Sequence, residues 1–515
     1  MKINIRERYQ KVAQYLKETS NHARRAIAEA LNISKSSVQR HISSRARRNR
    51  YPESYFWETA EGENWLRLLV FGAIYHFGIK GGIGSDSLAN FFQVLRLNEH
   101  IGVSASALRE LEVQFKAKII EYEQAQAEIC EQKKPDGICV GADETFFGLP
   151  ILVAIELFSG FIFSEAVCEN RTYETWWKQV SRWFDKEKCT CHFMVSDGAK
   201  ALVKLALSGL DCPHVPDLFH LLRAFSKSMG AAIAVQRARL HKQQLSAASE
   251  SAQELIATQL RQVETDHQDY QQSLHALSQA LHPFHIDTGE SQMEHELQPH
   301  LQPYLSTLER LSTIYAPTKS QSVLESWKRQ IPAMSGLIHA WWQWVLQSLS
   351  SQALEPETRN WLLDSLLPSV YWSQQTEKTR QPQLKQCYAQ AAQQAHTRLL
   401  ADSFTSSLNN IEQQRWVDWA IWISSKFQRT SSAVEGRNGY LSRLHHSNRG
   451  FSDQTLKVLT IIHNFDVKRD DGSTPAQRLF RHEFPDLFLW VLPRMRPLPT
   501  PRRSLKTPKP KKLTL

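Results

Sequence analysis

The chain has 515 residues, of which 42% are hydrophobic and 22% charged, a composition typical of globular proteins that excludes a fibre or a wholly disordered chain. Its formal net charge of +10 is carried by its two ends, since residues 1–50 hold 13 Lys or Arg against 3 Asp or Glu and residues 494–515 hold 8 against none. Basic ends on a slightly acidic body indicate a polyanionic partner, most simply nucleic acid.

The cysteine content and the N-terminal residues indicate in which cellular compartment the protein works. The seven Cys are an odd number spread thinly over a long chain, which favours a reducing compartment over a disulfide scaffold. The N-terminal residues MKINIRERYQKV contain no apolar signal segment, and the most apolar run, residues 65–79, is too short to span a bilayer. We therefore expect a cytoplasmic protein without membrane association.

Residues 1–50 are predicted to form a helix-turn-helix DNA-binding domain. Residues 26–40 have the layout of two helices joined by a turn, and Ser34 is a natural N-cap for the second helix. The alternative is a small helical bundle with a solvated basic face. In the DNA-binding interpretation, the residues that would face DNA are Lys35, Ser36, Ser37, Gln39, Arg40, Arg45, Arg47 and Arg48.

Residues 51–133 are predicted to form a helical domain that contains a possible second helix-turn-helix. This segment has no excess of basic residues, so contact with DNA and a purely structural role both stay open. The run of Lys, Pro, Asp and Gly at residues 133–137 marks a domain boundary.

A strand pattern follows in residues 134–225, which are predicted to form the first part of a mixed-sheet core. Residues 138–142 are a short apolar run that ends in Asp143 and Glu144. Two β-rich runs, residues 151–155 and 161–163, then fit the strands of a hairpin. Adjacent side chains of a strand point to opposite faces, so only one acid of the pair can face a given site.

Another apolar run, residues 192–195, is predicted to be a second buried strand, and Asp197 follows it. The sequence thus predicts acidic side chains at the ends of two buried strands. A zinc site is a competing interpretation nearby, although the ligand spacings are not those of structural zinc sites and buried free cysteines are common in strands. Its ligands would be Cys189, Cys191, Cys212 and His214.

Residues 226–425 are predicted to be an all-α insertion. Apolar residues spaced by three and four in residues 253–281 predict a long helix with a coiled-coil-like seam, which ends at Pro283. The histidines around that proline, His282, His285, His295 and His300, are predicted to lie in a solvated loop.

Residues 431–452, after the predicted insertion, are rich in polar and charged side chains: SSAVEGRNGYLSRLHHSNRGFS. The pattern predicts a helix that carries Glu435, Asn438 and Ser442 on one face. Residues 426–492 are predicted to hold the C-terminal helices of the core, and residues 493–515 a basic, Pro-rich disordered tail.

Two acids at the ends of buried strands and a third on a later helix form a convergent set of oxygen ligands for divalent metal. In phosphoryl transfer, two ions about 3.5–4 Å apart activate the attacking oxygen and stabilise the leaving one. On this interpretation Asp143 bridges two Mg²⁺ or Mn²⁺ ions, and Asp197 and Glu435 each hold one. Attack by water would cleave a DNA strand, and attack by a 3′-hydroxyl would join strands.

Three patches resemble the DDE transposases of bacterial insertion sequences, which have an RNase H-like core: ADETFF with its hairpin, VSDGAKALVKLAL followed by VPDLFHLLR, and VEGRNGYLSRLHHSNRGFS. The resemblance covers roughly residues 140–225 and 430–465. It implies that Asp143, Asp197 and Glu435 are the catalytic and metal-binding residues. In similar transposases a D-x-FH-like segment follows the second acid, which implies site neighbours at Asp217 and His220. From the residues themselves we expect Glu144, Arg437 and Asn438 as further site neighbours, and DNA contacts at Arg443 and Arg449.

The expected fold is therefore α+β and mostly helical, with an N-terminal helix-turn-helix region and an RNase H-like mixed-sheet core interrupted by the all-α insertion. The resemblance implies a bacterial, nucleoid-associated transposase that binds the terminal repeats of a mobile element and cleaves and transfers DNA strands. Its partners would be double-stranded DNA, as element ends and target, and a second copy of the chain in a synaptic complex. Two alternatives stay open: a non-catalytic DNA-binding regulator derived from a transposase, and an RNase H-like nuclease without strand joining.

Overall fold

The structure is a computed structural model that forms two compact units. Unit 1 contains Met1–Ile129, Arg443–Asp466 and Glu483–Leu515, and unit 2 contains Cys130–Ser442 and Val467–His482. The predicted segment 426–492 is thus divided between the two units. The structure describes residues 5–20, 22–48, 51, 54, 56–57, 59–184, 189–247, 249–350, 354–379, 381–429, 431–446, 450–469 and 471–501, without the side chains of residues 5–7, 47, 48 and 219.

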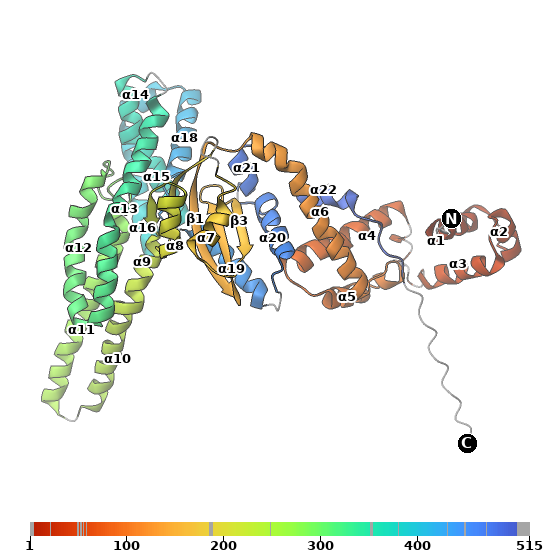
Figure 1. Cartoon of the computed structure of the whole chain (residues 1–515), viewed down its shortest axis with the longest axis horizontal. Coiled ribbons are helices and arrows are strands. Elements are labelled where there is room, and N and C mark those ends of the chain that lie inside the picture. The colour runs from red at the N-terminus through yellow and green to blue at the C-terminus, as the bar shows by residue number, and fades with distance from the viewer. Residues whose placement is uncertain are drawn as a thin grey trace. The chain divides into compact units, whose positions relative to one another are not determined.

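The protein is mostly helical and belongs to the α+β class, as expected (Figure 1). Within the described ranges, none of the helices has both the length and the apolarity needed to cross a bilayer.

Unit 1 begins with three helices, α1 (Ile5–Glu18), α2 (Arg24–Ala30) and α3 (Lys35–Arg48). They pack around a small core of Val12, Ile27, Ala28 and Val38. The backbone N–H of Ser37 donates to Ser34 Oγ at 3.2 Å, so Ser34 caps α3 as predicted.

The remainder of unit 1 is also helical. Tyr122 packs edge-on against Phe465 and Trp490, and Lys457 pairs with Glu123, which fixes α20 against α6. These elements are α4 (Ala60–Ala73), the π-helix η2 (Ile74–Lys80), α5 (Ser85–Val94), the 3₁₀ turn η3 (Leu97–Glu99), α6 (Ala105–Gln132), α20 (Asp453–Phe465), α22 (Leu487–Val491) and the 3₁₀ turn η7 (Leu492–Arg494).

The C-terminal tail is packed over its first part, which corrects the predicted start of disorder at residue 493. Leu498 is buried, and the N–H of Gly102 donates to the carbonyl of Pro499 at 2.7 Å. Composition alone missed this because the contact joins residues far apart in the chain. Residues 502–515 of the predicted tail lie outside the described residues.

Unit 2 is built on a five-stranded mixed sheet with the order β3-β2-β1-β4-β5. β1 and β2 are antiparallel, as are β2 and β3, whereas β1, β4 and β5 run parallel to one another. The predicted hairpin runs fall on β2 and β3. The strands are β1 (Gly137–Phe147), β2 (Leu149–Glu156), β3 (Ile162–Val167), β4 (Thr190–Ser196) and β5 (His214–Pro216).

β1 is longer than predicted, so Asp143 and Glu144 lie within the strand and not at its end. The parallel pairing of β1 with β4 stops at Gly141 and Val195, but the antiparallel pairing with β2 continues to Phe147. The acids therefore follow the last residue of β1 that pairs with β4. Sequence periodicity could not reveal this because it does not tell which neighbour a strand residue pairs with.

A long helical part covers residues 226–425 of unit 2 (Figure 1). Its core contains many tryptophans, among them the fully buried Trp327, Trp341 and Trp372. The helices in this part are the π-helix η5 (Ser226–Gly230), α10 (Ala231–Ser246), α11 (Glu250–Ala280), α12 (Glu294–Ile314), α13 (Pro317–Ser350), α14 (Pro356–Asn360), the π-helix η6 (Trp361–Leu366), α15 (Leu367–Lys378), α16 (Pro382–Ala401), α17 (Ser403–Ser407) and α18 (Asn410–Ser425).

The prediction that the histidines around Pro283 lie in a solvated loop is wrong for His282. His282 is fully buried, and its two ring nitrogens lie 2.5 Å and 3.0 Å from the hydroxyls of Tyr371 and Tyr388. Burial lowers the pKa of His282 well below its usual value. The ring is thus a neutral core group, which a loop-like local sequence does not reveal.

The other helices of unit 2 surround the sheet. Contacts of α13 with β5 and α9 join the helical part to the sheet edge. These helices are α7 (Tyr173–Val180), α8 (Lys200–Lys204), the π-helix η4 (Leu205–Gly209), α9 (Leu218–Phe225), α19 (Ser432–His446), whose last residues belong to unit 1, and α21 (Pro475–Phe480).

Candidate active site

The strand register brings two of the predicted acids together. Gly141 pairs with Val195 in the parallel ladder of β1 and β4, so extending the same register by two residues sets Asp143 opposite Asp197. Neighbouring strands are about 4.8 Å apart, and residues opposite each other share a face of the sheet. Asp197 correspondingly raises the pKa of Asp143 through charge repulsion.

This alignment depends on a β-bulge. Ile138 pairs with Cys191 but Cys139 pairs with Phe193, so His192 is an extra residue in β4. Without the bulge, Asp197 would stand opposite Glu144 on the other face of β1. A Cβ atom on Gly137 would collide with the His192 ring, so glycine at this position makes room for the bulge.

The third predicted acid, Glu435, lies in the first turn of α19. Asn438 Nδ2 donates to Asp143 Oδ2 at 3.0 Å, and Glu435 lies one helical turn before Asn438. His220 Nδ1, on α9, lies 3.7 Å from Glu435 Oε1. Asp143 and Glu435 both raise the pKa of His220, so the imidazole lies within the field of both carboxylates.

Asp217 holds the start of α19. Its Oδ2 accepts hydrogen bonds from the backbone N–H of Ser431, at 2.7 Å, and from the Ser431 hydroxyl. Its Oδ1 accepts from the N–H of His220 at 3.2 Å. Asp217 is 1% exposed, and the hydrogen bonds from His220 and Ser431 lower its pKa despite the cost of burial. Asp217 therefore links α9 to α19. Because both of its carboxylate oxygens already accept hydrogen bonds, it has little capacity to bind substrate.

Two carboxyls of the site are more basic than usual. Burial, together with the charges of Glu144 and Asp197, raises the pKa of Asp143 to about 6. Burial and the charge of Asp217 raise the pKa of Glu435, whereas His220 and Arg223 oppose that shift. A site that holds several carboxylates together at this cost is typical of function, not of stability.

We expect Asp143→Asn to stabilise the metal-free protein at neutral pH. The folded-state pKa of Asp143 is raised above its unfolded value, so the stability it contributes is present below about pH 4 and is lost as pH rises through about 6. The variant should therefore gain about 1–3 kcal/mol over the wild type above pH 6.5, and the difference should vanish near pH 4. Urea titrations with EDTA across this pH range measure it, and a constant difference at all pH values would contradict the assignment.

The remaining predicted neighbours point elsewhere. Glu144 forms an ion pair with Arg171, and its Oε2 is buried without a hydrogen-bond partner. Arg437 does not face Glu435; it is buried and binds the carboxylate of Glu165 on β3 with two hydrogen bonds. Sequence analysis missed Arg171 and Glu165, and it offered Ser431 only as a helix cap, because each partner of these residues is distant in the chain.

The residues predicted to contact DNA lie in unit 1. Lys35, Ser36 and Arg40 are exposed on α3. Ser37, Gln39 and Arg45 are partly buried, and Arg443 is exposed near the end of α19. The side chains of Arg47 and Arg48 lie outside the described residues, as does Arg449 altogether.

The proposed zinc ligands make other contacts. The ring Nε2 of His214 lies 2.8 Å from Ser196 Oγ. The Cys191 thiol donates to the carbonyl of Phe193 at 3.4 Å, and burial raises the pKa of Cys191 well above its usual value. A thiol in that state is a poor source of thiolate for a metal.

The donor chemistry at Asp143 fits a hard cation such as Mg²⁺. In the described part of the chain, no three His, Cys, Asp or Glu side chains have the spacing of a complete metal site. The available donors beside Asp143 are nevertheless oxygen atoms, and Asn438 Oδ1 is buried without a hydrogen-bond partner next to Asp143. An unsatisfied buried oxygen beside a carboxylate is a group that a cation would satisfy.

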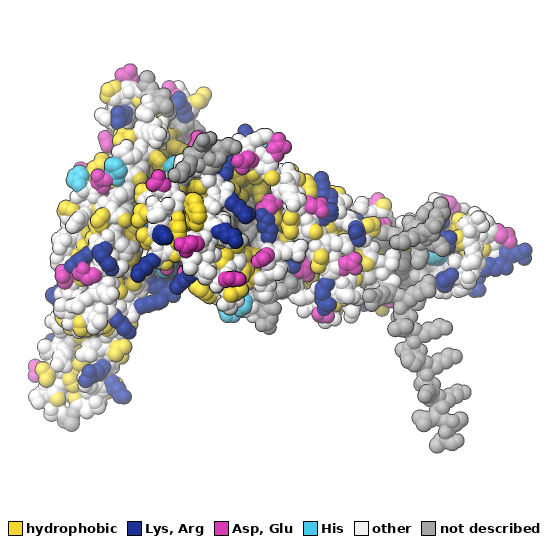
Figure 2. Space-filling model, in the orientation of Figure 1, with side chains coloured by type: hydrophobic (Ala, Val, Ile, Leu, Met, Phe, Trp, Pro, Cys, Tyr) yellow, Lys and Arg dark blue, Asp and Glu magenta, His cyan; other side chains and the backbone are white. Residues whose placement is uncertain are grey.

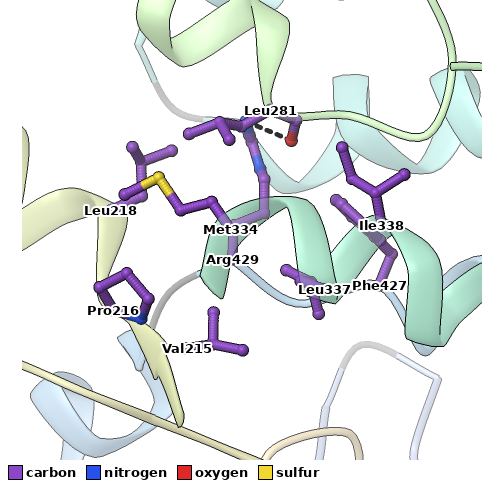
Figure 3. A pocket seen from close by; sticks show the side chains of 9 residues that line it. All are labelled: Val215, Pro216, Leu218, Leu281, Met334, Leu337, Ile338, Phe427 and Arg429. Atoms are coloured by element: carbon purple, nitrogen blue, oxygen red, sulfur yellow. Dashed lines mark hydrogen bonds between the residues drawn. The ribbon is translucent and has the colours of Figure 1, made fainter. Parts of the chain in front are cut away.

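A small cavity lies between β5, α9 and α13 (Figure 3). Its one charged lining residue, Arg429, donates to the carbonyls of Ser278 and Leu281. The cavity therefore offers no polar group to a phosphodiester, and it is not a substrate site. Its other lining residues are Val215, Pro216, Leu218, Leu281, Met334, Leu337, Ile338 and Phe427.

Comparison with known proteins gives one similarity. Residues 362–507 match a family of unknown function, DUF6399. The matched segment includes α19 with Glu435. It does not include β1, which carries Asp143, or β4, which precedes Asp197. No curated protein and no solved structure matches the chain.

Proposed function

We propose that this protein is a metal-dependent DNA transposase of the DDE type, with Asp143, Asp197 and Glu435 as its catalytic acids. One observation carries the proposal: Asp143 lies on β1 and Asp197 follows the adjacent parallel strand β4, while α19 donates to Asp143 through Asn438 and carries Glu435 one turn earlier, beside His220. Their order in the chain, on the first strand, after the fourth, and after a helical segment, is the order in the family that the sequence resembles. On this proposal the sheet of unit 2 is an RNase H-like core.

The residues around the acids have separate roles in this proposal. When bound, two Mg²⁺ or Mn²⁺ ions would activate the attacking oxygen and stabilise the leaving one. Asn438 fixes the orientation of the Asp143 carboxylate, and Asp217 fixes Glu435 by holding the first turn of α19. The Nδ1 atom of His220 lies 3.7 Å from a carboxylate oxygen of Asp217 and 3.7 Å from one of Glu435, and it would donate to a phosphate oxygen of the substrate.

Residues 1–50 are proposed to bind the ends of the element as a helix-turn-helix domain. Support comes from the exposed basic side of α3 and from the turn at residues 31–34, which sets α3 across α2. Because two DNA ends must be joined in one complex, the active form is proposed to contain two copies of the chain. The proposed place of action is the nucleoid of a bacterial cytoplasm.

The test uses the DNA that flanks the gene. Duplexes from both flanks, incubated with the full chain and Mg²⁺ or Mn²⁺, should be nicked at defined inverted repeats, and added target DNA should yield joined strands. Cleavage without joining would favour a nuclease. Specific binding with no metal-dependent cleavage would favour a non-catalytic regulator and would overturn the proposal.

A further inference from the structure

The helix that starts at the candidate active site carries Lys and Arg near both ends and contains no Asp or Glu. From Leu218 to Ser249 the chain contains five Lys or Arg and no Asp or Glu. This segment forms α9, η5 and α10 without a break, so it extends about 40 Å from the site. An acid-free stretch of this length is unusual in a body whose net charge is negative, and it needs a physical explanation.

The basic side chains begin within the site itself. His220 lies on the first turn, next to Glu435, and Arg223 one turn later is exposed and close enough to lower the pKa of Glu435. Lys227 follows at the next turn and is also exposed. The cations therefore continue outward from the point where a phosphodiester would react.

The outer half of the segment keeps its cations available. Arg239 and Lys242 on α10 are exposed, and within the described part of the chain neither forms a salt bridge. Arg237 differs, because it turns to α11 and pairs with Glu264 at 3.7 Å. In the view of Figure 2, Lys and Arg side chains gather along the helical part beside the sheet.

Small side chains are exposed on α10 beside these cations. Ala231, Ala234 and Ala238 are exposed on α10, and such small side chains allow a phosphate backbone to approach the helix closely. Val235 and Leu245 are exposed on the same helix, at 69% and 90%, which is the feature that a protein partner would use instead. The charge decides between these partners, since four exposed cations, in a segment without Asp or Glu, complement a polyanion.

We propose that α9, η5 and α10 form a DNA-backbone track that carries the duplex beside the scissile phosphate away from the active site. Arg223 and Lys227 contact the phosphates nearest the reaction, and Arg239 and Lys242 contact those farther along. The track reads charge and not sequence, so its partner is any duplex that enters the site. This inference rests on the proposed function, because it takes DNA as the substrate of the site.

The first test is photo-crosslinking in the full chain, with EDTA present and a short duplex of arbitrary sequence. The photoreactive residue p-benzoylphenylalanine replaces Ala238 on the track, Gln386 on the exposed side of α16 as a control, or Ser36 in the N-terminal region. We expect crosslinks to DNA from position 238 and none from position 386. Crosslinks to a second protein chain from position 238, or no crosslink there while position 36 reacts, would overturn the track.

The second test compares matched double variants. Arg239→Ala with Lys242→Ala should weaken binding of the same duplex about 10-fold at moderate salt and reduce the slope of log K against log [salt] by about 2. Arg359→Ala with Lys385→Ala, which removes two exposed cations from α14 and α16, should change neither quantity. Equal effects of both pairs would overturn the track. Because both tests work without metal, a chain that binds along α10 but never cleaves DNA would refute the proposed function and leave this inference standing.

Discussion

Asp143→Asn, Asp197→Asn and Glu435→Gln are each expected to lower metal-dependent DNA cleavage by about 10³-fold or more, while DNA binding stays within about twofold. Each substitution keeps the shape of the side chain and removes one negative charge that the site needs to hold its ions. Binding is spared because the exposed cations of α3 are not altered. Cleavage and gel-shift assays on the flanking duplexes measure the two quantities separately.

Two further variants sharpen this experiment. Glu174→Gln removes an exposed carboxylate from α7 and should leave cleavage unchanged. Glu144→Gln tests which acid of the adjacent pair acts, and we expect less than a 10-fold loss because Glu144 is engaged with Arg171. A fully active Asp197→Asn protein, or an inactive Glu144→Gln protein beside an active Asp143→Asn protein, would refute the assignment. The pH-dependent stability gain expected for Asp143→Asn ensures that its loss of activity cannot come from unfolding.

Arg437→Met is expected to cost about 3–5 kcal/mol of unfolding free energy, because it leaves the Glu165 carboxylate buried without its partner. The two side chains are 2% and 0% exposed and share two hydrogen bonds, of 2.8 Å and 2.6 Å. Denaturant unfolding followed by tryptophan fluorescence measures the loss. Glu165→Gln should be similarly costly, since it leaves the guanidinium unpaired.

The double variant Arg437→Met with Glu165→Leu separates a buried ion pair from a general packing defect. Removing both charges should recover most of the lost stability, because two apolar groups need no pairing. Cleavage should stay below the wild-type rate, however, since the pair fixes α19 between Glu435 and Asn438. Stability unchanged in the single variants would mean that the pair is not buried in solution.

Local patterns predicted much of the fold and the composition of the candidate site. The hairpin runs were recognised because short runs rich in β-branched and aromatic residues mark strands, and Ser34 was recognised because N-caps have a short sequence signature. The all-α character of residues 226–425 followed from helical spacing. Within the described residues of that part, the only β pairing is an isolated bridge between Phe284 and Ser291.

Other features depend on residues that the chain brings together from far apart. The partner of Arg437 is 272 residues away, and that of Asp217 is 214 residues away. Helix α20 was assigned to the core by its position in the sequence, yet it belongs to unit 1, where it packs against Tyr122 of α6. His282 was expected in solvent because it falls in an irregular connection next to a helix-ending proline, and only the packing of distant aromatic residues made it a core residue.

The sequence by itself determined which acids are available and on which kinds of element they lie, because strand and helix periodicity are local properties. It also determined where the positive charge lies, at the chain ends and along residues 218–249. Only the tertiary structure decided that Asp143 and Asp197 face each other. That alignment depends on one extra residue, His192, in the pairing of β1 with β4, and a shift of one residue would have turned Asp197 toward the opposite face.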